Sequence, residues 1–175
     1  MPSFSLVFFG FLGASLGLAA AARADALKVG DSAPATTGVT ETGATLDFAA
    51  VYKTQPYTLV YFFPKADTPG CTAQGCSLRD VYEDLTARGV AVIGVSHDRP
   101  EAQKAFKEKF HFPFTLVADP DGKVIEAFGV PTYPTGMAHR QAYLIKDGKI
   151  VWADYKASTN KQAQDVLKVL AGMKD

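Results

Sequence analysis

Strand-like apolar runs alternate with helical patterns along most of this chain, and that order restricts its fold more than any other feature. β-branched and aromatic residues dominate three runs that we predict to be buried strands. These runs are 58–63, 90–96 and 114–118. Helical patterns separate them, and the longest spans 71–88, with an apolar stripe at helical spacing from Leu78 to Leu85. Strands that alternate with helices predict a partly parallel sheet covered by helices on both faces.

Hairpins are predicted at both ends of this region. The first joins 36–39 to 44–46 around a Glu-Thr-Gly turn. The second joins 141–145 to 149–153 around Lys-Asp-Gly, and it adds an antiparallel edge to the sheet.

Two further helices are predicted from capping signals. Asp98, with Glu101 three residues later, indicates a helix that runs to about Lys109. Thr159 with Gln162 indicates a last helix close to the end of the chain. The fold class is therefore α/β, with a central mixed sheet.

The first 24 residues have the composition of a secretory leader. Residues 6–22 are almost wholly apolar or small, and the run ends in Ala-Arg-Ala before Asp25. No Lys or Arg precedes the run, so only the amino terminus supplies positive charge there. A retained membrane anchor is the competing interpretation, but the short run and its small-residue end favour cleavage. We predict a signal peptide at 1–24, a domain at 25–175 and a periplasmic or secreted protein.

The mature chain would be one ordinary domain of nearly neutral charge. Cleavage leaves 151 of the 175 residues, which is enough to bury a core. It removes one of 18 basic residues, so 17 remain against 18 acidic ones and the net charge is −1. Because no basic stripe stands out, nucleic acid and anionic membranes are not implied as partners.

The two cysteines of the chain follow the first buried strand. That strand leads through Pro64 and a turn to Cys71, at the first position of the predicted helix, and Cys76 comes five residues later. In sheets of this kind, sites gather at the carboxyl ends of the parallel strands. A thiolate is the reactive form of cysteine, and the unpaired N–H groups at a helix start favour it. We therefore predict a redox site at Cys71.

The spacing of the cysteines predicts that the site must move. On an intact helix, residues five apart have Cα atoms about 8.6 Å apart, whereas a disulfide needs less than about 7 Å. Bonding between Cys71 and Cys76 therefore requires the first turns to unwind. Gly75 lies within this segment and lowers the cost of unwinding by roughly 1 kcal/mol relative to alanine.

Other interpretations of the cysteines remain open on spacing and compartment alone. Export implies an oxidising environment, in which a permanent disulfide is the ordinary outcome. A zinc site would need His97, His111 or His139 as further ligands, but none has useful spacing, and we interpret His97 as a polar loop residue. A thioredoxin-type dithiol needs two residues between its cysteines, and here there are four.

The segment around the cysteines resembles the active-site motif of the peroxiredoxins. The pattern Pro64-x-x-x-Thr68-x-x-Cys71 carries this resemblance. The longer string FFPKADTPGCTAQGCSLRD, residues 62–80, is similar to the bacterioferritin-comigratory-protein (PrxQ) subfamily. The likeness continues through most of the mature chain. Further segments that share it are 30–34, 94–96 and 140–150.

This resemblance implies a thiol peroxidase on a thioredoxin-like fold, with Cys71 as the peroxidatic and Cys76 as the resolving cysteine. Pro64, Thr68 and Arg140 match the other active-site positions of the family. Arg140 is a fixed cation whose donor fork suits a thiolate and peroxide oxygens. Thr68 can orient the peroxide by a hydrogen bond, and Pro64 can shield the pocket from water.

The implied cycle reduces hydrogen peroxide or an organic hydroperoxide through a sulfenic acid on Cys71. Cys76 then forms an intramolecular disulfide, which a thioredoxin-like dithiol protein reduces. The resemblance implies no metal or organic cofactor. We expect a monomer or weak homodimer without stable membrane association once the leader is removed.

Three departures from the family pattern stand out. Ala142 replaces a common threonine after the arginine, and Gln74 replaces a common acidic residue between the cysteines. The leader is the third, since many relatives are cytosolic. The rival hypothesis is an exported thioredoxin-fold binding or structural module with a permanent Cys71–Cys76 disulfide.

Overall fold

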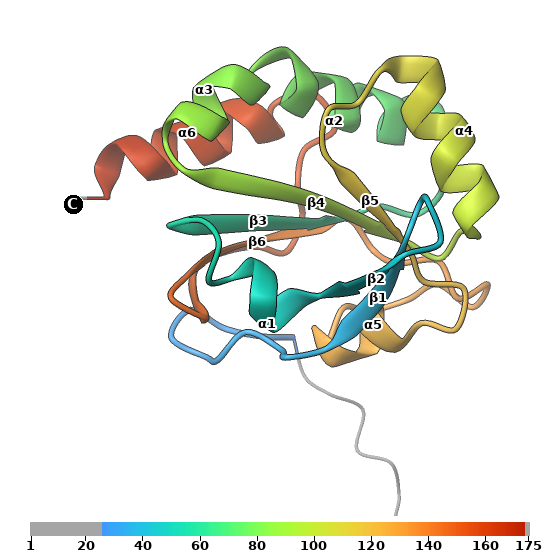
Figure 1. Cartoon of the computed structure of the whole chain (residues 1–175), viewed down its shortest axis with the longest axis horizontal. Coiled ribbons are helices and arrows are strands. Elements are labelled where there is room, and N and C mark those ends of the chain that lie inside the picture. Colours follow the sequence, from blue (N-terminus) through green and yellow to red (C-terminus); the bar gives the residue numbers. More distant parts are fainter. Residues whose placement is uncertain (1–25, 174–175) are drawn as a thin grey trace, which may run out of the picture.

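A seven-stranded sheet runs through the middle of the molecule (Figure 1). The structure is a computed structural model that describes residues 26–173, so the predicted leader lies outside the described residues. The strands are β1 (Thr37–Thr40), β2 (Thr45–Asp47), β3 (Tyr57–Phe62), β4 (Val90–Ser96), β5 (Thr115–Ala118), β6 (Gln141–Lys146) and β7 (Lys149–Asp154). Each strand predicted from the sequence is confirmed to within about two residues at either end.

The order of strands across the sheet is β2-β1-β5-β4-β3-β6-β7. The three central strands β3, β4 and β5 are parallel, and the two hairpins extend the sheet in antiparallel fashion on either side. The prediction of a mixed sheet is therefore confirmed. All six residues of β3 are buried, because the strand is central and both of its faces are covered.

Helices cover both faces of the sheet, as Figure 1 shows. On one side lie α2 (Pro69–Asp80), α3 (Tyr82–Ala87), α4 (Pro100–Phe110) and α6 (Gln162–Gly172). On the other lie α1 (Phe48–Val51) and α5 (Lys123–Ala127), both too short to leave a periodic pattern in the sequence. None of the helices within 26–173 is long and apolar enough to cross a membrane.

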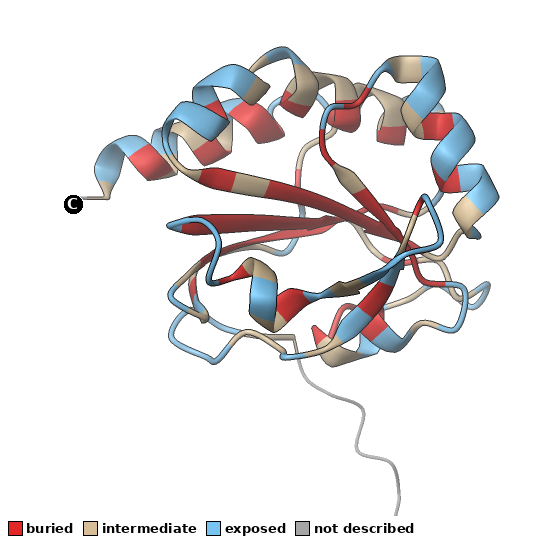
Figure 2. Ribbon diagram, viewed as in Figure 1, coloured by how far each residue is buried: buried red, intermediate tan, exposed pale blue. Residues whose placement is uncertain are grey.

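Each face of the sheet has its own apolar core, and Figure 2 shows the buried residues along the strands and on the inner faces of the helices. The core under α2, α3, α4 and α6 contains Cys71, Leu78 and Leu85. The core under α1 and α5 contains Phe48 and Phe128. Cys71 thus belongs to the face with the four longer helices.

The predicted helix over 71–88 is two helices rather than one. The backbone breaks at Val81, which has φ −116° and whose N–H donates to the carbonyl of Arg79 instead of continuing the helical ladder. Leu78 and Leu85 still reach the core from the two halves, so the apolar stripe predicted their burial correctly. The first half begins at Pro69, two residues before the predicted start, because proline suits the first helical position.

Both capping predictions were wrong about the side chains involved. Helix α4 begins at Pro100 with Arg99 as its N-cap, since the proline ring fixes the first turn there and leaves Asp98 outside the helix. Helix α6 has Lys161 as its N-cap and begins at Gln162. Asp98 and Gln162 instead make contacts to the segment around the cysteines.

Candidate active site

The loop that links β3 to α2 is fixed by contacts from the neighbouring strand and helix. The Asp98 carboxylate accepts hydrogen bonds from the N–H of Ala66, at 2.7 Å, and from the hydroxyl of Ser96, at 2.6 Å. Asp67 adopts a left-handed backbone conformation with φ 56°, and its carboxylate pairs with Lys109 on α4. These contacts place the start of α2 over the carboxyl end of β3, as the sequence predicted.

The first turn of α2 keeps N–H groups free of side-chain caps. Thr68 is the N-cap residue, but its hydroxyl donates to the carbonyl of Lys65 over 3.0 Å and makes no capping bond. Pro69 has no N–H to satisfy. The N–H groups of Gly70 and Cys71 therefore remain available to an anion or a polarised oxygen beside the Cys71 sulfur.

Cys71 and Arg140 are brought together by strand pairing. Arg140 immediately precedes β6, whose residue Gln141 lies opposite Phe62 at the end of β3. The guanidinium Nη2 of Arg140 donates a hydrogen bond to Cys71 Sγ over 3.3 Å. Cys71 is only 2% exposed, so this contact is made in a largely water-free setting in which a fixed positive charge acts strongly.

Two glutamines extend this contact into the core. Arg140 Nη1 donates to Gln74 Oε1, and Gln74 Nε2 donates to Gln162 Oε1 on α6. Both glutamine side chains are fully buried. The sequence marked Gln74 as a departure from the family pattern, but no local signal pointed to Gln162, because its partner lies 88 residues away.

Cys76 lies on the same helix as Cys71, partly buried against the apolar core. Both cysteines are free thiols. Because α2 is continuous from Pro69 to Asp80, the helical spacing that prevents a disulfide applies here. The last of the four residues between them, Gly75, packs directly on Phe112: a Cβ added there would lie 2.6 Å from the ring.

The structure brings some of the predicted site residues into closer contact than others. Pro64 is half-buried in the loop, and Thr68 is half-buried at the helix start. Within residues 26–173, the structure records no hydrogen bond from Thr68 to Cys71. Only Arg140, among the predicted partners, contacts the Cys71 sulfur by a hydrogen bond.

Tyr61 lies near the two cysteines, on β3. Burial raises the pKa of its hydroxyl above the ordinary value, and the negative charge that Cys71 can carry adds to that effect. The hydroxyl is enclosed beside Gly94 and has no hydrogen-bond partner within the described part of the chain. Tyr61 and Cys71 belong to the same apolar core.

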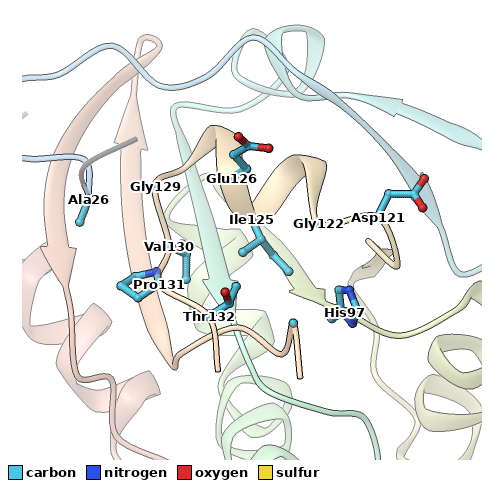
Figure 3. A pocket seen from close by; sticks show the side chains of 11 residues that line it. Ala26, His97, Asp121, Gly122, Ile125, Glu126, Gly129, Val130, Pro131 and Thr132 are labelled. Carbon is cyan, nitrogen blue, oxygen red and sulfur yellow. The ribbon is translucent and has the colours of Figure 1, made fainter. Parts of the chain in front are cut away.

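A separate cleft of about 530 Å³ lies on the other face of the sheet (Figure 3). Its lining includes His97, Ile125 and Val130. None of the five predicted site residues lines it. His97, interpreted from the sequence as a loop residue, therefore borders a cleft that does not contain Cys71. No three side chains of His, Cys, Asp or Glu in the described residues are grouped to hold a metal ion.

The fold and the site together define a thioredoxin-like redox protein. Residues 29–153 match the AhpC/TSA family. The chain is 41% identical to peroxiredoxin Bcp of Escherichia coli K12 over 143 residues, which cover 77% of this chain and 90% of that protein. It is 35% identical to chloroplastic peroxiredoxin Q of Populus jackii over 147 residues, covering 82% and 68%.

Solved structures agree with these matches. Peroxidoxin BcpB of Mycobacterium tuberculosis superposes with a TM-score of 0.78 at 25% identity, covering 85% of this chain and 99% of that one. A cysteine mutant of peroxiredoxin Q from Xanthomonas campestris gives 0.73 at 26% identity, covering 85% and 98%. The chain belongs to the AhpC/TSA family, and its relatives are the Bcp and PrxQ peroxiredoxins. It is therefore an oxidoreductase of the thiol peroxidase class.

Proposed function

We propose that this protein reduces hydrogen peroxide and organic hydroperoxides through Cys71, with Cys76 as the resolving cysteine. The observation that carries the proposal is the 3.3 Å hydrogen bond from Arg140 to Cys71 Sγ, made in the uncapped first turn of α2. A guanidinium and free N–H groups both favour the thiolate, which is the nucleophile.

In the first step, the Cys71 thiolate attacks one oxygen of the peroxide and the O–O bond breaks. The sulfur becomes a sulfenic acid, while the second oxygen takes up a proton and leaves as water or an alcohol. Arg140 and the Cys71 N–H stabilise the charge that develops on the oxygens. Because the Thr68 proton is already donated to Lys65, Thr68 Oγ1 is left to accept the O–H of the peroxide.

In the second step, Cys76 attacks the sulfenic sulfur, water leaves and a disulfide forms. The first turns of α2 must unwind for the two sulfurs to meet. Unwinding breaks the packing of Gly75 on Phe112 and the hydrogen bond between Gln74 and Gln162. These contacts therefore hold the reduced form until Cys71 has reacted.

In the third step, an external dithiol attacks the Cys71–Cys76 disulfide and restores both thiols by exchange. We assign this role to a thioredoxin-like protein, because the dithiol of such a protein can reach and attack a disulfide that is exposed on an unwound helix. The two electrons that reduce the peroxide come from this dithiol, and no metal or organic cofactor takes part.

We also propose that the protein is exported and acts in the periplasm or outside the cell, as a monomer or weak homodimer. The apolar run at 6–22 and the Ala-Arg-Ala pattern before Asp25 support this location. N-terminal sequencing of the protein from a periplasmic extract tests it, because cleavage at the expected site makes Asp25 the first residue. A chain that still begins at Met1 would contradict cleavage.

The proposed chemistry is tested by peroxide consumption in the presence of dithiothreitol. The parent protein should consume peroxide with turnover, and Cys71→Ser should abolish it. Cys76→Ser should retain the first step, because the small dithiol can reduce the sulfenic acid directly. If Cys71→Ser consumes peroxide as fast as the parent, Cys71 is not the reacting residue and the proposal is lost.

A further inference from the structure

A line of three hydrogen bonds connects the Cys71 sulfur to α6, a helix with no predicted part in the chemistry. Arg140 donates from one nitrogen to Cys71 Sγ and from another to Gln74 Oε1. Gln74 Nε2 then donates to Gln162 Oε1. Since Gln74 and Gln162 are both 0% exposed, water does not compete for these bonds.

The donor and acceptor chemistry of the line permits one orientation of each amide. A guanidinium can only donate, so Gln74 must present its oxygen to Arg140. Its NH₂ group is then directed to α6, where Gln162 must present an oxygen in turn. This arrangement leaves Gln162 Nε2 buried without a hydrogen-bond partner among the described residues.

The segment before α6 also contacts Arg140 and the first turn of α2. The N–H of Ala157 donates to the Arg140 carbonyl over 3.3 Å. Gly70 lies against Thr159, since a Cβ at position 70 would come within 3.2 Å of Thr159 Cγ2 and 3.4 Å of Arg140 Nη2. Residues 157–162 therefore contact Arg140 in two ways. Ala157 bonds to its backbone carbonyl, and Gln162 reaches its guanidinium through Gln74.

We propose that Gln162 is a positioning residue for Arg140 and acts through Gln74. Its oxygen fixes the Gln74 amide, so that the Gln74 oxygen holds one side of the guanidinium while the other side donates to Cys71. Without that oxygen, the Gln74 amide can rotate and present its NH₂ group to Arg140. Two facing donors repel each other, and the guanidinium moves away from the sulfur. The inference deepens the proposed function and rests on it for its effect on peroxide reduction.

The test replaces Gln162 with Met, which has nearly the same size and shape but no amide oxygen. The second-order rate constant for peroxide reduction at pH 7 should fall about three- to tenfold, the range expected for partial loss of one hydrogen bond to a charged group. The rate of Cys71 alkylation by iodoacetamide should begin to rise at a higher pH than in the parent. At strongly alkaline pH, where the thiol is ionised in both proteins, the two alkylation rates should converge.

Three control variants separate positioning from stability. Gln162→Glu keeps an oxygen acceptor for Gln74, and it should retain more of both rates than Gln162→Met, although a buried carboxylate carries a desolvation cost of its own. Gln164→Met changes an exposed glutamine on the same helix and should leave both rates unchanged. Leu170→Ala weakens the α6 core without touching the hydrogen-bonded line, so it should lower the unfolding free energy but not move the alkylation profile.

The inference is overturned if the pH profile of Cys71 alkylation in Gln162→Met coincides with that of the parent, or if Leu170→Ala moves the profile as much. Ionisable groups near Cys71 include Arg140, Tyr61 and Cys76, and none of the variants replaces them. Alkylation does not require peroxidase activity. If the parent failed to reduce peroxide, the proposed function would be lost while the alkylation profile would still decide the role of Gln162.

Discussion

Arg140 donates a hydrogen bond to Cys71 Sγ from a position 69 residues along the chain. Antiparallel pairing explains the contact, because the register of β6 on β3 places Gln141 opposite Phe62 at the strand end that leads to the cysteine. The charge therefore comes from the residue that immediately precedes β6, and the pairing of β6 with β3 fixes the backbone at that point. A rigid origin of this kind keeps the guanidinium in position during the reaction.

Replacing Arg140 with Ala should slow peroxide reduction by about 10²- to 10³-fold, as expected for loss of a group that stabilises charge in the transition state. Arg140→Lys should give an intermediate rate, because a single ammonium cannot bond to both Cys71 and Gln74 in the geometry of a fork. Stopped-flow kinetics with hydrogen peroxide measures both. Arg88→Ala, at an exposed position after α3, is the matched control. An unchanged rate in Arg140→Ala would remove Arg140 from the site.

Gly75→Ala should destabilise the protein, although alanine is the better helix former. The added Cβ would lie 2.6 Å from the Phe112 ring, and overpacking of this kind costs about 1–3 kcal/mol against a propensity gain of about 1 kcal/mol. Urea unfolding measures the difference. Gly172→Ala is the control, because nothing lies within 4 Å of a Cβ there, and it should not destabilise. Equal gains in stability at both positions would refute the close packing of α2 on Phe112.

Tyr61→Phe should leave the protein as stable at pH 7 or raise its stability by about 1 kcal/mol, because the buried hydroxyl has no recorded partner in residues 26–173. The variant should also resist alkaline unfolding better. Burial raises the pKa of Tyr61 above its unfolded value of about 10, so the folded state excludes the phenolate. The free energy of unfolding is therefore unaffected by Tyr61 ionisation below pH 10. It falls as the pH rises above 10, because the unfolded chain then loses the Tyr61 proton and the folded chain keeps it.

Unfolding at a series of pH values from 7 to 11 measures this effect, within the range in which tyrosine ionises in the unfolded chain. The alkaline loss should shrink in Tyr61→Phe without vanishing, since burial also raises the pKa of Tyr52 and Tyr143. Tyr133→Phe removes an exposed phenol whose hydroxyl makes no hydrogen bond to another of the described residues, and it should not change the profile. A large loss of stability in Tyr61→Phe at pH 7 would mean that the hydroxyl has a partner.

Much of the fold could be predicted from the sequence, because the central strands are continuous apolar runs rich in β-branched and aromatic residues, a pattern typical of strands buried on both faces. The site residues Cys71 and Arg140 were predicted from motif resemblance, and the structure places them in contact. The helix break at Val81 and the true role of Asp98 could not be predicted. The role of Asp98 depends on a partner that tertiary packing supplies, because its carboxylate accepts a hydrogen bond from the N–H of Ala66 and does not cap a helix. Gln162 was missed for the same reason.

Oxidation of the cysteines should melt the beginning of α2. Hydrogen exchange followed by mass spectrometry should show faster exchange across 69–80 in the disulfide form than in the reduced form. Peptides from β4 should exchange equally slowly in both, because that strand lies in the centre of the sheet. Slow exchange over 69–80 in both forms would contradict the predicted unwinding.

The division of roles between the two cysteines is tested most directly by mass spectrometry of the reduced protein after one equivalent of hydrogen peroxide. The parent should lose two hydrogen atoms and contain a Cys71–Cys76 disulfide. Cys76→Ser should instead gain one oxygen, located on Cys71 and trapped by dimedone as a sulfenic acid. If Cys71 of that variant stays an unmodified thiol, whether or not the peroxide is consumed, Cys71 is not the attacking residue. The account of Cys71 as the attacking and Cys76 as the resolving residue is then contradicted.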